Sequence, residues 1–146
     1  MLDFVVKAWD ENQEKLKEAL MEMTVLVGDI IFYEMKYKDI MRLIVHFILN
    51  GADGRNGQWD EERIHQIDDG EYQGTLLFLV PKRTYQPTAG EYLITKVEYG
   101  SCSGCDTLQS ISAMDDDPYG KVERYMALCL HMVESMRAPF ENEEDW

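Results

Sequence analysis

The sequence predicts an α+β fold, in which a small antiparallel sheet of three or more strands is packed by two or three long helices. Apolar residues recur at helical spacing near both ends of the chain, whereas the middle reads as short strands. Within the middle part, Asp68-Asp69-Gly70 is a tight-turn signal between two strand-like runs. The 146 residues suffice for a single α+β domain, which we expect over residues 1–138, followed by an acidic tail at 139–146.

The first element is expected to be a packing helix over residues 2–23. Its apolar side chains at helical spacing are Val5, Trp9, Leu16, Leu20 and Met23. On the solvated side, Glu11 and Lys15 form an i,i+4 pair in the favourable order. Residues 24–34 are β-branched and aromatic but interrupted by Gly28-Asp29, so they fit either a hairpin or a continued helix with a break.

A second helix is predicted over residues 36–49. Its apolar side chains are Tyr37, Ile40, Met41, Ile44, Phe47 and Ile48. Asn50-Gly51 then ends the helix as a C-terminal stop. His46 lies beside the apolar face, which favours a partly buried helix histidine over a metal ligand. Residues 52–58 are expected to form a loop without the strand-before, helix-after context of a phosphate-binding motif.

The sheet is expected to be a meander of residues 63–67, 71–80 and 91–99. The run 76–80 is apolar on both faces, which suits a central strand covered on each side. Pro81 ends this strand. In the third strand, the residues expected on one face are Leu93, Thr95, Val97 and Tyr99.

The last helix is predicted to begin at Pro118 and to end near Arg137. Proline suits the first helical turn, and the preceding Asp115-Asp116-Asp117 supplies an N-cap. The buried stripe of this helix is expected to contain Val122, Tyr125, Met126, Cys129, Met132, Val133 and Met136. Pro139 stops the helix and the acidic tail follows.

Two of the three cysteines lie in the stretch YGSCSGCDTLQSI, residues 99–111, directly after the third predicted strand. If a helix begins here, Cys102 and Cys105 lie in its first turn, where unpaired backbone N–H groups favour a thiolate. Cys102 would then be an activated nucleophile and Cys105 its resolving partner. The alternative is a tight turn in which both cysteines are small buried hydrophobes.

Metal binding is a third use of the Cys102-x-x-Cys105 spacing, since one such knuckle supplies half of a tetrahedral zinc site. The other half would have to come from Cys129, His131, His65 or His46. Cys129 and His131 lie about 200° apart around a helix axis, so both cannot easily face one ion. Zinc held by Cys102 and Cys105, with His65 as a further ligand, thus stays an alternative to a protein without a cofactor.

The chain is strongly acidic, with 28 acidic against 14 basic side chains and a formal net charge of −14. Direct binding to nucleic acid or to an anionic membrane is not expected, because no basic surplus exists to neutralise phosphates. The apolar runs are far shorter than the roughly 20 residues that cross a bilayer, and no secretory signal is recognisable. The odd number of cysteines favours a reducing compartment, and we expect a cytoplasmic protein.

Residues 68–111, which include YGSCSGCDTLQ, together with MALCLHMVESM at 126–136, resemble a set of uncharacterised small proteins encoded by bacteriophages. The resemblance covers roughly the C-terminal two-thirds of the chain. It implies a phage gene product that acts in the bacterial host cytoplasm, and it favours a role in host takeover or anti-defence. It assigns no catalytic residue.

Two functional hypotheses follow. In the first, the acidic surface binds a basic site on a host bacterial protein, such as a nucleic-acid-binding enzyme. The residues predicted to contact the partner are Asp60, Glu61, Glu62, Asp68, Asp69, Asp115, Asp116, Asp117, Glu143, Glu144 and Asp145. In the second, Cys102 and Cys105 make a small redox or metal-binding protein or enzyme. The nine methionines also leave room for a homodimer interface.

Overall fold

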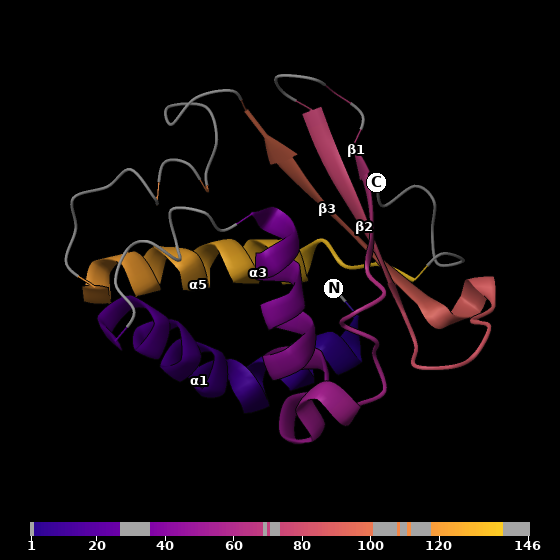
Figure 1. Ribbon diagram of the computed structural model, residues 1–146, viewed down its shortest axis with the longest axis horizontal. Helices are drawn as coiled ribbons and strands as arrows, with labels where there is room; N and C mark the ends of the chain where they lie inside the picture. The colour runs from indigo at the N-terminus through magenta and orange to yellow at the C-terminus, as the bar shows by residue number, and fades with distance from the viewer. Residues whose placement is uncertain are drawn as a thin grey trace.

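Helices and sheet form two layers, with the helices gathered on one face of a three-stranded antiparallel sheet (Figure 1). The computed structural model describes residues 2–26, 36–68, 70, 74–100, 108, 111 and 118–138. The predicted α+β class with a small antiparallel sheet is confirmed. In this part of the chain, no helix combines the length and the apolar character needed to cross a membrane.

The first helix, α1, spans Asp3–Leu26. Its buried side chains repeat at helical spacing, and they are Val5, Trp9, Leu16 and Leu20. This stripe packs α1 against both the second helical segment and the last helix. The helix runs three residues past its predicted end, which assigns 24–26 to it, and residues 27–35 lie outside the described ranges.

The second helical segment changes its winding twice. The α-helix α3, Tyr37–Leu43, continues into a π-helix, η1, Ile44–Leu49, and then into a 3₁₀-helix, η2, Gly51–Asn56. The backbone N–H of Asn50 donates to the carbonyl of Val45 at 2.9 Å, the i+5 bond that defines the wider turn. Gly51 has φ +54, which confirms the predicted stop, while the predicted loop at 52–58 is mostly a 3₁₀ turn.

The sheet has the order β1-β2-β3, with β1 at His65–Asp68, β2 at Gly74–Pro81 and β3 at Tyr92–Tyr99. A 3₁₀ turn, η3, Ala89–Glu91, leads into β3. The central position of β2 agrees with its apolar sequence, and of the two faces expected to be covered one is buried and the other is half-buried among the described residues. Burial alternates along β2 because the helices of the described ranges lie on one side of the sheet (Figure 1), and all four residues of β1 are exposed.

The last helix, α5, spans Pro118–Glu134 and packs on both α1 and β3. It ends earlier than predicted because the following residues join the sheet: Arg137 and Ile94 exchange two backbone hydrogen bonds of 2.8 Å. The Thr95 hydroxyl also donates to the carbonyl of Met132 at 2.7 Å. Apolar side chains of α1, α3, η1, α5, β2 and β3 meet in one core between the layers.

Candidate functional site

A histidine and a glutamate meet where η1 turns into η2. His46 Nδ1 lies 2.7 Å from Glu61 Oε2, and the other carboxylate oxygen of Glu61 lies 3.9 Å from Arg55 Nε. The Glu61 side chain is only 11% exposed, whereas that of His46 is 34% exposed. A carboxylate accepts but does not donate, so Nδ1 must carry the proton that forms the bond. In the neutral imidazole, Nε2 is therefore the ring nitrogen that bears the lone pair.

Gly54 brings the backbone of η2 against this ring. A Cβ at this position would lie 3.1 Å from His46 Cε1 and 3.2 Å from Nε2, and Gly54 has φ +50. Both the space and the backbone conformation therefore favour glycine. Within the described ranges His46 Nε2 has no hydrogen-bond partner. No side-chain nitrogen or oxygen there is both buried and without a partner, so Nε2 is accessible to solvent. The prediction that His46 is a partly buried helix residue is confirmed. The orientation of its ring by Glu61 was not predicted from the sequence.

The junction of η1 and η2, residues 44–56, is called the elbow below. A buried side-chain amide, that of Asn50, holds it in place. Asn50 Nδ2 donates to the carbonyl of Trp59 at 2.9 Å, and the Trp59 N–H donates to Asn50 Oδ1 at 2.9 Å. Gly57 makes room for this side chain, because a Cβ there would lie 2.3 Å from the Asn50 Cγ. On the other side, Asn12 of α1 donates to the carbonyl of Ile48 at 3.1 Å. The elbow is thus fixed to both α1 and the segment that follows it.

Asp60 lies in an adjacent cluster of charges. Its buried carboxylate lies 3.6 Å from Arg63 Nη1 and 3.8 Å from Arg83 Nη1, and it accepts the Glu62 N–H at 3.1 Å. Arg83 also donates from Nε to the carbonyl of Gly57 at 2.9 Å. These contacts tie the chain around residue 60 to the end of β2. The role of Asp60 is therefore structural.

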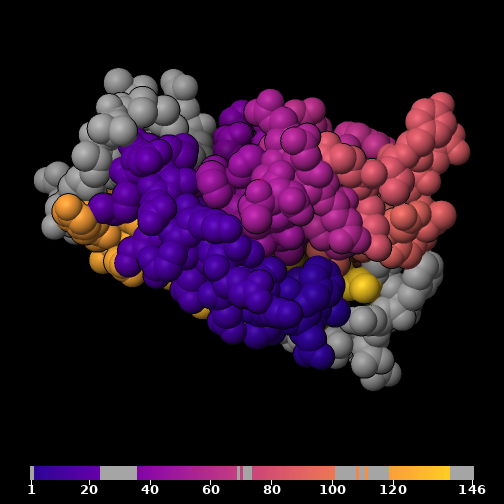
Figure 2. Space-filling view, turned by 90° about the horizontal axis from the view of Figure 1, so that it is seen from below, coloured from indigo at the N-terminus to yellow at the C-terminus, as the bar shows by residue number. Residues whose placement is uncertain are grey.

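A hollow of about 400 Å³, open to solvent, lies between α1 and the elbow. Figure 2 shows α1, in indigo, running alongside the purple and magenta segment that carries η1 and η2. The residues that line the hollow are Lys15, Glu18, Ala19 and Glu22 from α1, and His46, Phe47, Gly51 and Ala52 from the elbow. His46 thus lines the same cavity as Glu18 and Glu22.

Those two carboxylates belong to an acidic row along α1. Asp10, Glu14, Glu18 and Glu22 are spaced four residues apart and are all exposed, so each lies next to the following one in a row that winds around the helix by about 40° per step. In the part of the chain that the structure describes, none of the four has an ion-pair partner. The sequence analysis missed this row, although its period of four can be read directly from the sequence.

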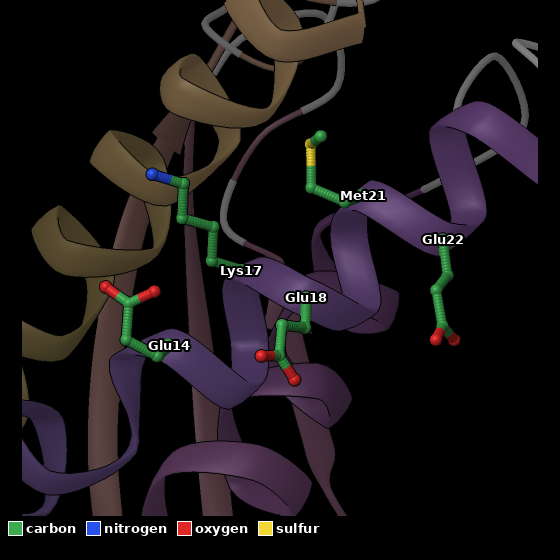
Figure 3. Close-up of a pocket in the computed structure, with 5 residues that line it drawn as sticks. All are labelled: Glu14, Lys17, Glu18, Met21 and Glu22. Atoms are coloured by element: carbon green, nitrogen blue, oxygen red, sulfur yellow. The ribbon is translucent and has the colours of Figure 1, made fainter.

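A second hollow, also of about 400 Å³, lies on the other side of the row and is lined by Glu14, Lys17, Glu18, Met21 and Glu22. In Figure 3 the Lys17 ammonium points away from Glu18 and Glu22 and toward α5. It lies 2.7 Å from Glu123, and this hydrogen bond, followed by the charge of Glu123, raises the pKa of Lys17. Lys17 is thus engaged with α5, and Glu18 and Glu22 form a ridge between two hollows.

The structure revises the predicted partner-binding residues. Asp60 and Glu61 were expected to face a partner, but both are buried. Their carboxylates pair with nearby arginines and with His46 inside the protein. Glu62, His65 and Asp68 are exposed. Asp68 accepts hydrogen bonds from the Tyr99 hydroxyl and the Gly70 N–H, and these bonds lower the pKa of Asp68.

The remaining predicted site residues lie outside the described ranges, and they are Asp69, Cys102, Cys105, Asp115, Asp116, Asp117, Glu143, Glu144 and Asp145. Within those ranges, no group of three or more histidine, cysteine or acidic side chains could hold a metal ion. Cys129 is in the core, as predicted, and burial raises its pKa to about 12. At neutral pH it is a packed thiol rather than a thiolate ligand.

Comparisons of this chain with protein-family models, with curated proteins and with solved structures find no match.

Proposed function

We propose that this protein is a phage-type accessory factor that binds a host bacterial protein, with its acidic α1 face against a basic site of the partner. The resemblance of residues 68–111 to small phage proteins supports the biological setting, and the net charge of −14 supports the sign of the interaction. A nucleic-acid-binding enzyme is a suitable partner class, because its phosphate-binding groove is a concentrated basic surface.

The acidic row of α1, formed by Asp10, Glu14, Glu18 and Glu22, is the observation that carries this proposal. Like charges at i,i+4 destabilise a helix by about 0.2–0.5 kcal/mol per pair. The neighbouring row of Asp3, Lys7, Glu11 and Lys15 alternates in sign, and Lys7 and Glu11 are 4.0 Å apart. A helix that served only to pack would gain stability from such alternation on both rows. Basic side chains of a partner would turn the repulsion into attraction.

The contact surface is accordingly centred on α1. Exposed Glu62 and Asp68 lie on other elements and are secondary candidates, whereas Asp60 and Glu61 are engaged within the protein. The predicted contacts at 115–117 and 143–145 remain part of the proposal on sequence grounds alone. Association of this kind is fast, because opposite charges attract over distance, and it weakens as salt screens them.

The test is a tagged pull-down from bacterial lysate at low and high salt, with bound proteins identified by mass spectrometry. Two variants are compared with the unchanged chain. One neutralises the row, and it is D10N/E14Q/E18Q/E22Q. The matched control neutralises four other exposed acids, and it is D3N/E11Q/E98Q/E134Q. Each variant removes four negative charges, so both change the net charge from −14 to −10.

The proposal expects one stoichiometric partner that salt releases, that the row variant loses and that the control variant retains. Binding that ignores salt, or that both variants weaken equally, would contradict it. Absence of a partner at either salt would favour the alternative, a redox or metal-binding role of Cys102 and Cys105. That alternative expects rapid alkylation of Cys102 below neutral pH and loss of activity, without loss of stability, in Cys102→Ser.

A further inference from the structure

We propose that the turn between β2 and β3, residues 82–91, is a second contact with the partner, at which Tyr85 inserts into an apolar pocket of that protein. This inference rests on the proposed function and goes beyond it. The acidic row of α1 accelerates association, whereas a buried aromatic anchor slows dissociation. The two contacts can therefore be separated by kinetics.

Tyr85 exposes an aromatic ring that makes no contribution to the packing of the fold. It is 92% exposed, the highest value among the exposed large apolar side chains of the described ranges. Phe4, which is also exposed, differs because it stacks on Trp59 with ring centroids 6.2 Å apart. Within the described ranges Tyr85 has no hydrogen bond and no ring contact. The apolar surface of its ring is thus available to a partner.

Hydrogen bonds fix the chain just before Tyr85. The Arg83 N–H donates to the carbonyl of Gln58 at 2.7 Å. Arg63 Nη1 donates to the carbonyl of Thr84, also at 2.7 Å. The backbone that leads into the tip of the turn is thus tied to the segment that precedes β1.

A capping box fixes the chain just after the tip. The Thr88 N–H and hydroxyl both donate to the Glu91 carboxylate at 3.1 Å, and the Glu91 N–H donates to the carbonyl of Thr88 at 2.9 Å. Only residues 85–87 lie between the two fixed ends, and Pro87 has a restricted φ. The tip is therefore ordered before it binds, which reduces the entropy cost of association.

The tip also differs from the rest of the chain in charge. Residues 84–90 contain no acidic or basic side chain, although 29% of the chain is charged. All of them are exposed except Pro87, which is partly buried. Figure 2 shows the salmon segment, which contains this turn, projecting from the body on the face where α1 is seen. A partner can therefore enclose the tip without burying an unpaired charge.

These features define the pocket that fits the tip. It is apolar and wide enough for one phenol ring, and it offers a hydrogen-bonding group to the Tyr85 hydroxyl. Its rim is uncharged, because the tip has no charge to pair with it. Tyrosine suits this role, since its ring is large and has few side-chain torsions to immobilise.

The experiment measures binding kinetics with the captured protein of the pull-down immobilised on a sensor. Tyr85→Ala should raise the dissociation rate constant at least about tenfold and leave the association rate constant and its salt dependence unchanged. Tyr119→Ala is the matched control, since Tyr119 is 67% exposed on α5, and it should change neither constant by more than about twofold. The row variant should instead lower the association rate constant.

The order of the tip is measured without a partner. Amide nitrogen relaxation by NMR should give backbone order parameters of about 0.85 at Tyr85 and Gln86, and values below about 0.6 would overturn the ordered tip. Thr88→Ala removes the hydroxyl bond to Glu91, so it should lower these order parameters and weaken binding several-fold with the ring still present. Tyr85 and Thr88 are both exposed, so neither variant should unfold the protein.

The outcomes separate this inference from the proposed function. If Tyr85→Ala and Tyr119→Ala have equal effects, or if Tyr85→Ala changes only the association rate constant, the anchor is refuted. A salt-released partner that depends on the α1 row would still stand in that case. A partner that Tyr85→Ala loses and the row variant retains would keep the anchor and refute the acidic face. Absence of a partner at either salt would refute both.

Discussion

Two groups of carboxylates in this protein behave in opposite ways. Asp60 and Glu61 are buried, and side chains from residues 46, 55, 63 and 83 surround them. The acidic row of α1 is exposed and has no ion pair in the described ranges. The local density of acidic residues does not distinguish the groups. The difference depends on whether the fold brings cations to the carboxylates, and only the second group retains charge for a partner.

Glu61 and Glu18 show the same contrast around one ring. Glu61 bonds to Nδ1 of His46 and fixes its tautomer, whereas Glu18 lines the same hollow as His46 and makes no ion pair within the described ranges. The first carboxylate is a positioning group, and the second is available to a ligand. Mutations in the two groups should therefore change stability in opposite directions.

The largest expected effect comes from breaking the buried group. Asp60→Ala should lower the free energy of unfolding by about 2–3 kcal/mol, because it removes the buried carboxylate that pairs with Arg63 and Arg83 and leaves the Glu62 N–H without its acceptor. Urea denaturation measures the change. Glu62→Ala is the control, since this neighbour is exposed and should shift stability by no more than about 0.5 kcal/mol. Equal losses in the two variants would show that Asp60 is not the buried anchor.

A somewhat smaller loss is expected when the support of the His46 ring is disturbed. Gly54→Ala should cost about 1–2 kcal/mol, since Gly54 has φ +50 and a Cβ would lie 3.1 Å from the ring. Gly90→Ala is the matched control, because its Cβ would meet nothing within 4 Å. Thermal unfolding of both variants checks the prediction. A control as unstable as Gly54→Ala would mean that the ring contact is unimportant.

Neutralising the acidic row of α1 should raise the stability of the protein, in contrast to the two variants above. The variant D10N/E14Q/E18Q/E22Q removes three like-charge i,i+4 pairs and should be more stable by about 1 kcal/mol at low salt. The control D3N/E11Q/E98Q/E134Q also makes the net charge less negative, but it removes the favourable Lys7–Glu11 pair. The difference between the two should shrink in concentrated salt. A row variant that is less stable than the control would show that the carboxylates serve the fold.

The smallest expected effect concerns one exposed carboxylate that does have partners. Tyr99→Phe should raise the pKa of Asp68, because the Tyr99 hydroxyl is the main group that lowers this pKa, followed by the Gly70 N–H. Because the pKa of Asp68 is lowered in the folded state, its carboxylate stabilises the fold at pH values above about 3.8, the usual pKa of the group. This stabilisation is lost as the pH falls through the folded-state pKa. An NMR titration of the Asp68 side chain measures the shift. An unchanged pKa would show that the hydroxyl bond does not form in solution.

Much of the fold was predictable because its signals are local. The α+β class, the central position of β2, the stop at Gly51 and the burial of Cys129 all follow from periodicity and turn chemistry within short stretches. The coverage of β2 on one face was not predictable in this way. An apolar strand does not show how many layers pack on it, and here the helices that the structure describes lie on one side of the sheet.

The candidate site was predictable only in part. His46 was recognised as a half-buried helix residue, and the row of acids on α1 could have been found from its period of four. The pairing of His46 with Glu61 could not, because it joins residues 15 positions apart through a π-helix and a 3₁₀ turn. The hollow has walls from α1 and the elbow, which are separated by more than 20 residues of sequence.

The order of residues is thus enough to specify the helices, the strands, the total charge and the spacing of the acids on α1, because each depends on composition or on neighbours within a few positions. Three-dimensional packing alone separates buried carboxylates from exposed ones and gives His46 a direction. The physical reason is that a charge is neutralised by whatever lies within a few ångströms in space. For Asp60, one such neighbour is Arg83, more than 20 residues further along the chain.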